Sequence, residues 1–116
     1  MAHVERPEDL SAAVVALINA GDLDGLLDLY EEAAVLERPD GTLAAGRSQI
    51  RQFYADLLET KPYFEPGVVL PALVQGDLAL TTTQIGVSAS VEIARRQPDA
   101  GWRWLIDRPD VLRPAT

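Results

Sequence analysis

The stretch "LINAGDLDGLLDLYEEAAVLERPDGTLAAGR", residues 17–47, contains the signals that decide the fold. Gly21 is placed to end a first helix in the left-handed conformation, and Asp22 to cap a second. The second helix is predicted to continue to Tyr30, because apolar residues recur at i, i+3, i+4 and i+7: Leu23, Leu26, Leu27 and Tyr30.

The helical period ends after this second helix. Residues 34–37 predict a short strand, Pro39-Asp40-Gly41 a turn, and residues 42–44 a return strand. A third helix follows Gly46 and is predicted to end at Lys61-Pro62. Its apolar stripe consists of Ile50, Phe53, Tyr54, Leu57 and Leu58.

The regions on either side extend this pattern. Before residue 17, a helix is predicted from Pro7, with a stripe of Leu10, Val14, Leu17 and Ile18. After residue 66, two predicted hairpins turn at Gly76-Asp77 and at residues 98–100. Pro71 marks the first of these four strands as an edge strand or a bulged one. Alternation in the last strand predicts one shared face for Trp102, Trp104 and Ile106.

Helices segregated from strands predict an α+β fold. We expect three N-terminal helices on one face of a strongly curved, mostly antiparallel sheet, forming a cone with a cavity between the layers. The 116 residues fit one domain, 1–116, with a loose tail from about residue 109.

Composition excludes several classes of function. The net charge of −8 repels phosphate backbones, so nucleic-acid binding is not expected. Without cysteine, and with His3 as the only histidine, neither a zinc site nor a Ser-His-Asp triad is expected. The N-terminus resembles no signal peptide, and no apolar run reaches the ~20 residues of a membrane span. We therefore expect a cytoplasmic protein without metal or cofactor; its basic residues, all arginine except Lys61, are typical of high-GC bacteria.

Three segments carry a resemblance to a known superfamily: "NAGDLDGLLDLY" (19–30), "RPDGTLAAGRSQIRQFYADLL" (38–58) and "GWRWLIDRPDV" (101–111). They resemble the nuclear-transport-factor-2-like superfamily, and within it the steroid isomerase and SnoaL-like polyketide cyclase group. The resemblance implies a cystatin-like cone and a homodimer formed through the outer sheet face. It specifies the fold well and the activity poorly.

The isomerases of this superfamily use a carboxylate base, a tyrosine and a protonated acid. The resemblance places the base at Arg38 and the tyrosine at Val14, and neither side chain can perform that role. The protonated acid matches Glu92 most nearly. The cyclases use a histidine, for which only His3 is available, and the epoxide hydrolases an Asp-Arg-Asp set that Arg38 imitates in part with Glu92 or Glu37.

The sequence leaves two possible positions open for each of the two candidate catalytic residues. Arg38 either enters the cavity as an anion holder or lies exposed at the hairpin turn. Glu92 either faces the cavity, as the resemblance implies, or faces outward. The outward reading follows if the alternating apolar set Val87, Ala89, Val91 and Ile93 faces the helices.

The resemblance also implies a set of ligand-contacting side chains, for which plain core packing is the alternative: Val14, Tyr30, Phe53, Tyr54, Leu57 and Trp104. Trp102 either lines the cavity or fills a dimer interface, and the interface is the favoured reading. Three hypotheses follow. The first is a protein that binds a small apolar or polyketide- or steroid-like molecule without catalysis. The second is an isomerase-, cyclase- or hydrolase-type enzyme using Arg38 and Glu92, and the third an interaction module with a filled cavity.

Overall fold

A computed structural model of the chain describes residues 3–112. In chain order, the described part contains η1 Pro7–Asp9, α1 Leu10–Ala20, α2 Leu23–Leu27, β1 Tyr30–Glu37, β2 Leu43–Ala45, α3 Arg47–Glu59, β3 Val68–Val69, β4 Leu73–Gln75, β5 Leu78–Ile85, β6 Ser88–Arg96 and β7 Trp102–Arg108. The strands form one sheet in the order β2-β1-β7-β6-β5-β3, with β4 also paired to β5. Only β1 and β7 are parallel neighbours. This confirms the predicted α+β class.

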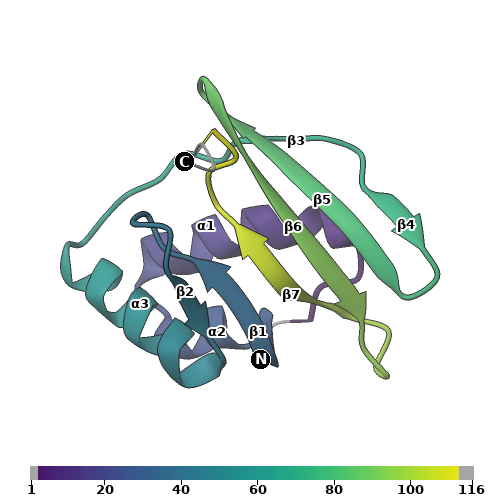
Figure 1. The fold of residues 1–116 in the computed structure, drawn as a ribbon, viewed down its shortest axis with the longest axis horizontal. Coiled ribbons are helices and arrows are strands. Elements are labelled where there is room, and N and C mark those ends of the chain that lie inside the picture. Colours follow the sequence, from purple (N-terminus) through teal and green to yellow (C-terminus); the bar gives the residue numbers. More distant parts are fainter. Residues whose placement is uncertain (1–2, 113–116) are drawn as a thin grey trace.

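The helices and the sheet form two layers. Figure 1 shows α1 behind the sheet and α3 beside β1 and β2. The largest fully buried side chains come from both layers: Tyr30, Leu10, Leu26, Leu29, Leu36, Ile50 and Thr83. None of the helices in the described part of the chain has the length and apolarity needed to span a bilayer.

The chain turns twice between α1 and β1. Gly21 ends α1 with a φ of 70°, a left-handed conformation that glycine adopts without a steric cost. Asp22 caps α2, and its carboxylate accepts a hydrogen bond from the amide of Gly25 at 2.9 Å. The predicted helix through Tyr30 is wrong, because α2 ends at Leu27 and Tyr30 begins β1. Tyr30 belongs to the buried face of a strand, so its spacing from Leu27 matched a helix by coincidence.

The predicted hairpins are present. The amide of Arg38 donates to the carbonyl of Thr42 at 2.8 Å, which closes the turn between β1 and β2. Pro71 falls between β3 and β4, so the predicted edge strand is interrupted there.

A bulge in β7 changes which side chains face the helices. Ile93 of β6 pairs with Ile106, but the next residue, Ala94, pairs with Trp104. Leu105 is therefore an extra residue, and the alternation of faces shifts by one beyond it. The prediction that Ile106 shares a face with Trp104 is wrong: Ile106 is 47% exposed on the outer face.

The orientation of β6 decides between the two readings of Glu92. Ser90, Glu92 and Ala94 are buried, whereas Val91 and Ile93 are only partly buried. Glu92 therefore faces the helices, as the resemblance implied, and Val91 and Ile93 lie on the outer face of the sheet. The prediction that Trp102 belongs to a dimer interface is wrong as well. Trp102 is buried in the core, with the Arg96 guanidinium 4.7 Å from its ring centre.

The segment after β7 is held against β6 as far as the structure describes it. The amide of Val111 donates to the carbonyl of Ala89 at 2.9 Å, and the hydroxyl of Ser88 donates to Asp110 at 2.6 Å. The start of the tail expected to be loose is thus ordered by contacts, and residues 113–116 lie outside the described residues.

Candidate functional site

A partly open cavity of 330 Å³ lies between the helices and the inner face of the sheet. Its apolar walls come from α1, α3, β1, β5 and β7: Val14, Val15, Ile18, Leu36, Phe53, Tyr54, Leu57, Ile85 and Trp104. Five of the six side chains expected to contact a ligand are in this set. The sixth, Tyr30, is fully buried directly behind Tyr54, with their ring centres 5.9 Å apart.

Two carboxyl groups meet on the floor of this cavity. Glu92 of β6 and Asp107 of β7 are directly opposite each other in the sheet, and both line the cavity. They are 3% and 6% exposed, respectively. Facing side chains on neighbouring strands have Cβ atoms about 5 Å apart, so a charge on one carboxyl group disfavours a charge on the other.

Burial and mutual repulsion keep a proton on this pair. Burial, followed by the neighbouring charge of Glu92, raises the pKa of Asp107 to about 8. Burial also raises the pKa of Glu92, partly offset by hydrogen bonds from Ser90 and Thr81. At neutral pH Asp107 therefore keeps its proton for most of the time, and the two acids are not both charged.

A chain of tyrosine hydroxyls ends at Asp107. The hydroxyl of Tyr30 donates to Oδ2 of Asp107 at 2.6 Å. Its hydrogen is then committed, so the 2.6 Å contact between the Tyr30 and Tyr54 hydroxyls is a bond donated by Tyr54. Burial raises the pKa of both tyrosines, which remain neutral donors over the range in which the acids titrate.

A second chain ends at Glu92. The hydroxyl of Thr81 donates to Oε1 of Glu92 at 2.6 Å, and the indole nitrogen of Trp104 donates to the hydroxyl of Thr81 at 3.3 Å. The rings of Trp104 and Tyr30 also pack edge to face at 5.6 Å, so the two series of hydrogen-bonded side chains contact each other. The acid pair is thus held in place from both sides.

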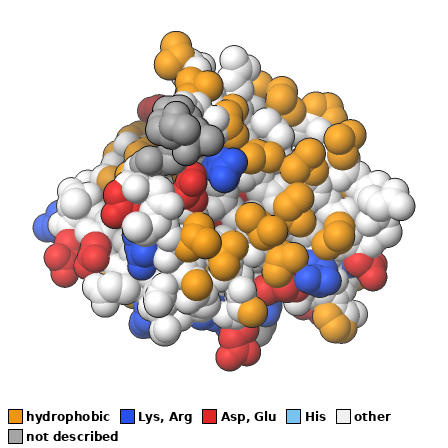
Figure 2. Space-filling view, viewed as in Figure 1, with side chains coloured by type: hydrophobic (Ala, Val, Ile, Leu, Met, Phe, Trp, Pro, Cys, Tyr) orange, Lys and Arg blue, Asp and Glu red, His pale blue; other side chains and the backbone are white. Residues whose placement is uncertain are grey.

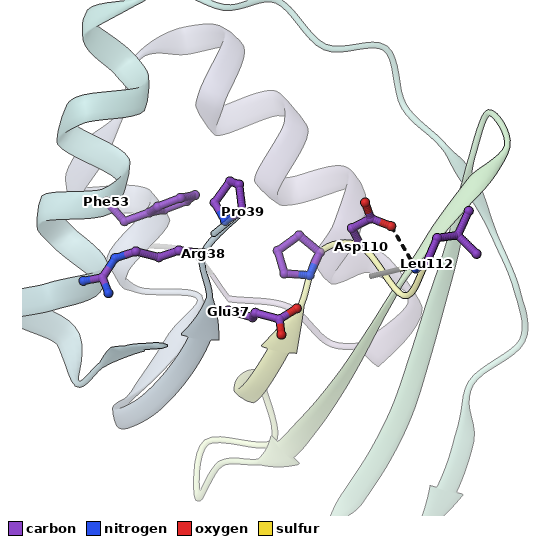
Figure 3. Close-up of a pocket in the computed structure, with 7 residues that line it drawn as sticks. Glu37, Arg38, Pro39, Phe53, Asp110 and Leu112 are labelled. Carbon is purple, nitrogen blue, oxygen red and sulfur yellow. Dashed lines mark hydrogen bonds between the residues drawn. The ribbon is translucent and has the colours of Figure 1, made fainter. Parts of the chain in front are cut away.

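Arg38 lies outside this cavity. Its guanidinium donates to the hydroxyl of Thr42 at 3.2 Å and to the carbonyl of Leu43 at 2.8 Å, within its own hairpin. A larger hollow of 530 Å³ includes the stem of Arg38 with Glu37 and Asp110. Figure 3 shows the guanidinium directed away from these two carboxylates. The structure therefore does not bring Arg38 and Glu92 together, because the half-buried Arg38 is held within its own hairpin.

The hollow and the cavity share two lining residues, Phe53 and Pro109. Asp110 and Leu112, on its rim, are exposed. We interpret the hollow as the mouth of the cavity, because the buried polar groups all belong to the inner compartment.

A strap after α3 covers another side of the cavity. Phe64, Glu65 and Gly67 line it. Asn19, from the "NAGD" segment, fixes the strap by donating to the carbonyl of Phe64 at 2.9 Å and accepting from its amide at 2.8 Å. Gly67 lies so close to β5 that a Cβ there would be 2.6 Å from a methyl group of Thr83. A side chain at position 67 would push the strap away from the sheet.

Asp107 is the site residue that the sequence did not indicate. Strand alternation from Trp104 assigns it to the outer face, and only the bulge at Leu105 turns it inward. Its position in "WRWLIDR", an acid among apolar residues, was the available signal. Within residues 3–112, no group of three or more metal-ligating side chains is arranged to hold a metal ion.

Comparisons with known proteins agree with this architecture. The sequence pattern of the SnoaL-like domain matches residues 12–113. A ketosteroid isomerase-like protein from Erwinia carotovora atroseptica is 16% identical, with a TM-score of 0.73 over 92% of this chain and 94% of that one. A Nostoc punctiforme protein of unknown function with a cystatin-like fold is 18% identical, with a TM-score of 0.66 over 93% of this chain and 91% of that one.

An NTF2-like protein with a cystatin-like fold from Novosphingobium aromaticivorans is 22% identical, with a TM-score of 0.62 over 93% of this chain and 81% of that one. At these identities the structural likeness shows the fold alone. It agrees with the cone expected from the sequence.

Proposed function

The chain belongs to the SnoaL-like family, and from this premise we propose that it binds a small, largely apolar molecule in the cavity between the helices and the sheet. The observation that carries the proposal is the partly open cavity of 330 Å³ with apolar walls and a few buried polar groups on one side. This combination is typical of small-molecule sites. The volume is at the lower end of their range, which favours a small ligand; a polyketide- or steroid-like class is implied only by the family resemblance.

Filling the cavity tests this proposal. Val14 lines the cavity from α1, so Val14→Phe is expected to weaken binding of the neutral probe 4-phenylbutan-1-ol by about tenfold or more, because the ring takes up the ligand's space. Isothermal titration calorimetry measures the affinity, and circular dichroism monitors the fold.

Val87→Phe is the matched control, since Val87 is 96% exposed in the turn before β6. The same added volume there is expected to leave the affinity unchanged. Equal binding by both variants and the original protein would place the ligand elsewhere.

The acid pair favours catalysis as a second candidate. A carboxylic acid next to a carboxylate, both in an apolar cavity, can donate a proton to one atom of a ligand and accept one from another. In this arrangement Asp107 and Glu92 form the pair, and Arg38 has no part. Turnover that disappears in Asp107→Asn distinguishes this candidate from binding alone. The open volume argues against a module whose cavity is filled by its own side chains.

We also propose that a second copy of the chain covers the outer face of the sheet. Figure 2 shows hydrophobic side chains gathered over β5, β6 and β7 on this face. Leu73, Leu78 and Ile106 are 70%, 41% and 47% exposed there. Arg108 and Glu37 form a 3.5 Å ion pair beside the patch, so the same surface offers both charges to an identical partner.

Ile106→Glu is expected to convert the dimer to a monomer, because it buries two unpaired carboxylates about the two-fold axis. Sedimentation equilibrium measures the mass. Val87→Glu, in the exposed turn, is expected to remain dimeric. A monomeric parent protein at micromolar concentration contradicts the proposal.

A further inference from the structure

Four of the polar side chains around the cavity donate their hydrogens to one another or to the acid pair. Tyr54 donates to Tyr30, and Tyr30 donates to Asp107. Trp104 donates to Thr81, and Thr81 donates to Glu92. Every one of these bonds runs toward the acid pair. What remains open to a ligand is therefore mainly oxygen lone pairs of the two carboxyl groups, although Glu92 also accepts a hydrogen bond from Ser90.

Thr83 adds a third open oxygen. Its hydroxyl is the one buried side-chain polar atom among residues 3–112 without a hydrogen-bond partner. Thr83 is 1% exposed and lines the cavity on β5, directly opposite Ser90 of β6. An unpartnered buried hydroxyl is costly, and a ligand atom that bonds to it removes that cost.

The cavity contains negative charge and no positive side chain. None of the described residues that line it is Lys, Arg or His. The titratable groups in and behind its lining are Tyr30, Tyr54, Glu65, Glu92 and Asp107. The negative charge of the acid pair is thus neutralised by nothing in the cavity, and a buried charge without a partner is unfavourable.

The apolar walls also suit a cation. Four aromatic side chains line the cavity: Phe53, Tyr54, Phe64 and Trp104. Aromatic faces attract ammonium groups, most strongly where water is excluded. The net charge of −8 draws cations toward the protein as a whole.

From these placements we propose that the natural ligand carries a protonated amine, held between the carboxyl groups of Glu92 and Asp107 and the hydroxyl of Thr83, with its apolar part against the aromatic and aliphatic walls. An ammonium group offers three donors to these three acceptor groups. The inference rests on the proposed small-molecule function and specifies the chemical class of that ligand.

Binding of an ammonium group has a defined proton balance. Asp107 keeps its proton for most of the time at neutral pH, as its raised pKa indicates. The cation stabilises both carboxylates, so that proton leaves to the solvent as the amine binds. Affinity for an amine is therefore expected to rise with pH between 6 and 8. A neutral ketone accepting the pair's proton would show the opposite trend.

A matched pair of probes tests the inference. 4-Phenylbutylamine and 4-phenylbutan-1-ol differ in the ammonium group alone, and calorimetry at pH 7 in phosphate and in Tris measures affinity and proton release together. We expect the amine to bind about tenfold tighter or more, the scale of a charge-assisted hydrogen bond, with release of up to one proton.

Variants assign this preference to the named groups. Glu92→Gln, Asp107→Asn and Thr83→Val are each expected to reduce amine affinity, the two acid variants by about tenfold, while alcohol affinity changes little. Glu59→Gln, an equal charge change at the exposed end of α3, is expected to leave both affinities unaltered. If Glu59→Gln lowers the affinity for the amine by as much as the two acid variants, the preference comes from the overall charge of the protein. That result would overturn the inference.

The outcomes separate the two proposals. Alcohol binding without any preference for the amine overturns the ammonium site and leaves the small-molecule function standing. The inference is also overturned if the neutral ketone 4-phenylbutan-2-one binds tighter than the amine and its binding disappears above pH 8. That result would mean that the acid pair acts as a hydrogen-bond donor. Failure of all three probes, with the fold intact, counts against both proposals.

Discussion

At pH 9 the protein is expected to be roughly 4 kcal/mol less stable to unfolding than at pH 5, because Asp107 must lose its proton inside the fold. Its pKa is raised from an ordinary value of 3.8 to about 8 by burial and by Glu92. Between these two values the folded chain binds a proton that the unfolded chain has released. Stability therefore falls as pH rises through this window, and the loss is complete above pH 8. Glu92 acts in the same direction.

Guanidinium unfolding at pH 5, 7 and 9 measures this dependence. Asp107→Asn is the decisive comparison, since the amide occupies the same volume and does not titrate. The Asp107→Asn variant is expected to show little change in the free energy of unfolding between pH 5 and 9. At pH 9 it is expected to be more stable than the original protein. Glu59→Gln, on the surface, is expected to keep the original slope. An unchanged slope in Asp107→Asn would mean that general repulsion among the acidic side chains, rather than the buried pair, sets the pH dependence.

Replacing Trp104 with alanine is expected to lower the free energy of unfolding by about 4 kcal/mol. Trp104 is 3% exposed, packs edge to face on Tyr30 and donates its indole hydrogen to Thr81. Its removal extends the existing cavity, leaves Tyr30 unsupported and deprives Thr81 of a donor. Because the cavity is already open on that side, the chain has little opportunity to close over the gap.

Guanidinium titration followed by the fluorescence of Trp102 measures the change, since Trp102 remains in the variant. Trp104→Phe keeps most of the apolar volume and is expected to lose about half as much stability. Val87→Ala, at a 96% exposed position, is expected to change stability by less than about 0.5 kcal/mol. A loss below about 1 kcal/mol in Trp104→Ala would contradict the packing described for the cavity wall.

Local sequence signals predicted where most of the helices and strands begin or end. Gly21, Asp22 and Pro71 placed the end of α1, the cap of α2 and the break between β3 and β4, because each acts through its own dihedral or hydrogen-bonding limits. The helix assigned through Tyr30 failed because five residues of helical spacing do not distinguish a short helix from a helix that runs into a strand.

The wall of the cavity was also accessible from the sequence. The helical stripes of α1 and α3 placed Val14, Phe53, Tyr54 and Leu57 on one side, and the family resemblance indicated that this side encloses a cavity. Glu92 was undecided, since its own strand alternates apolar residues on the opposite face. Val91 and Ile93 of that set face outward in the structure, where the proposed partner copy would cover them.

The sequence by itself determined the fold class and the helical lining of the cavity, since these depend on residue type and periodicity. The tertiary structure alone decided the chemistry of the floor. The single extra residue at Leu105 turns Asp107 inward, opposite Glu92, and Tyr30, far away in the sequence but on the neighbouring strand β1, supplies its donor. A bulge is a property of pairing between two strands, so no periodicity read along one strand can reveal it.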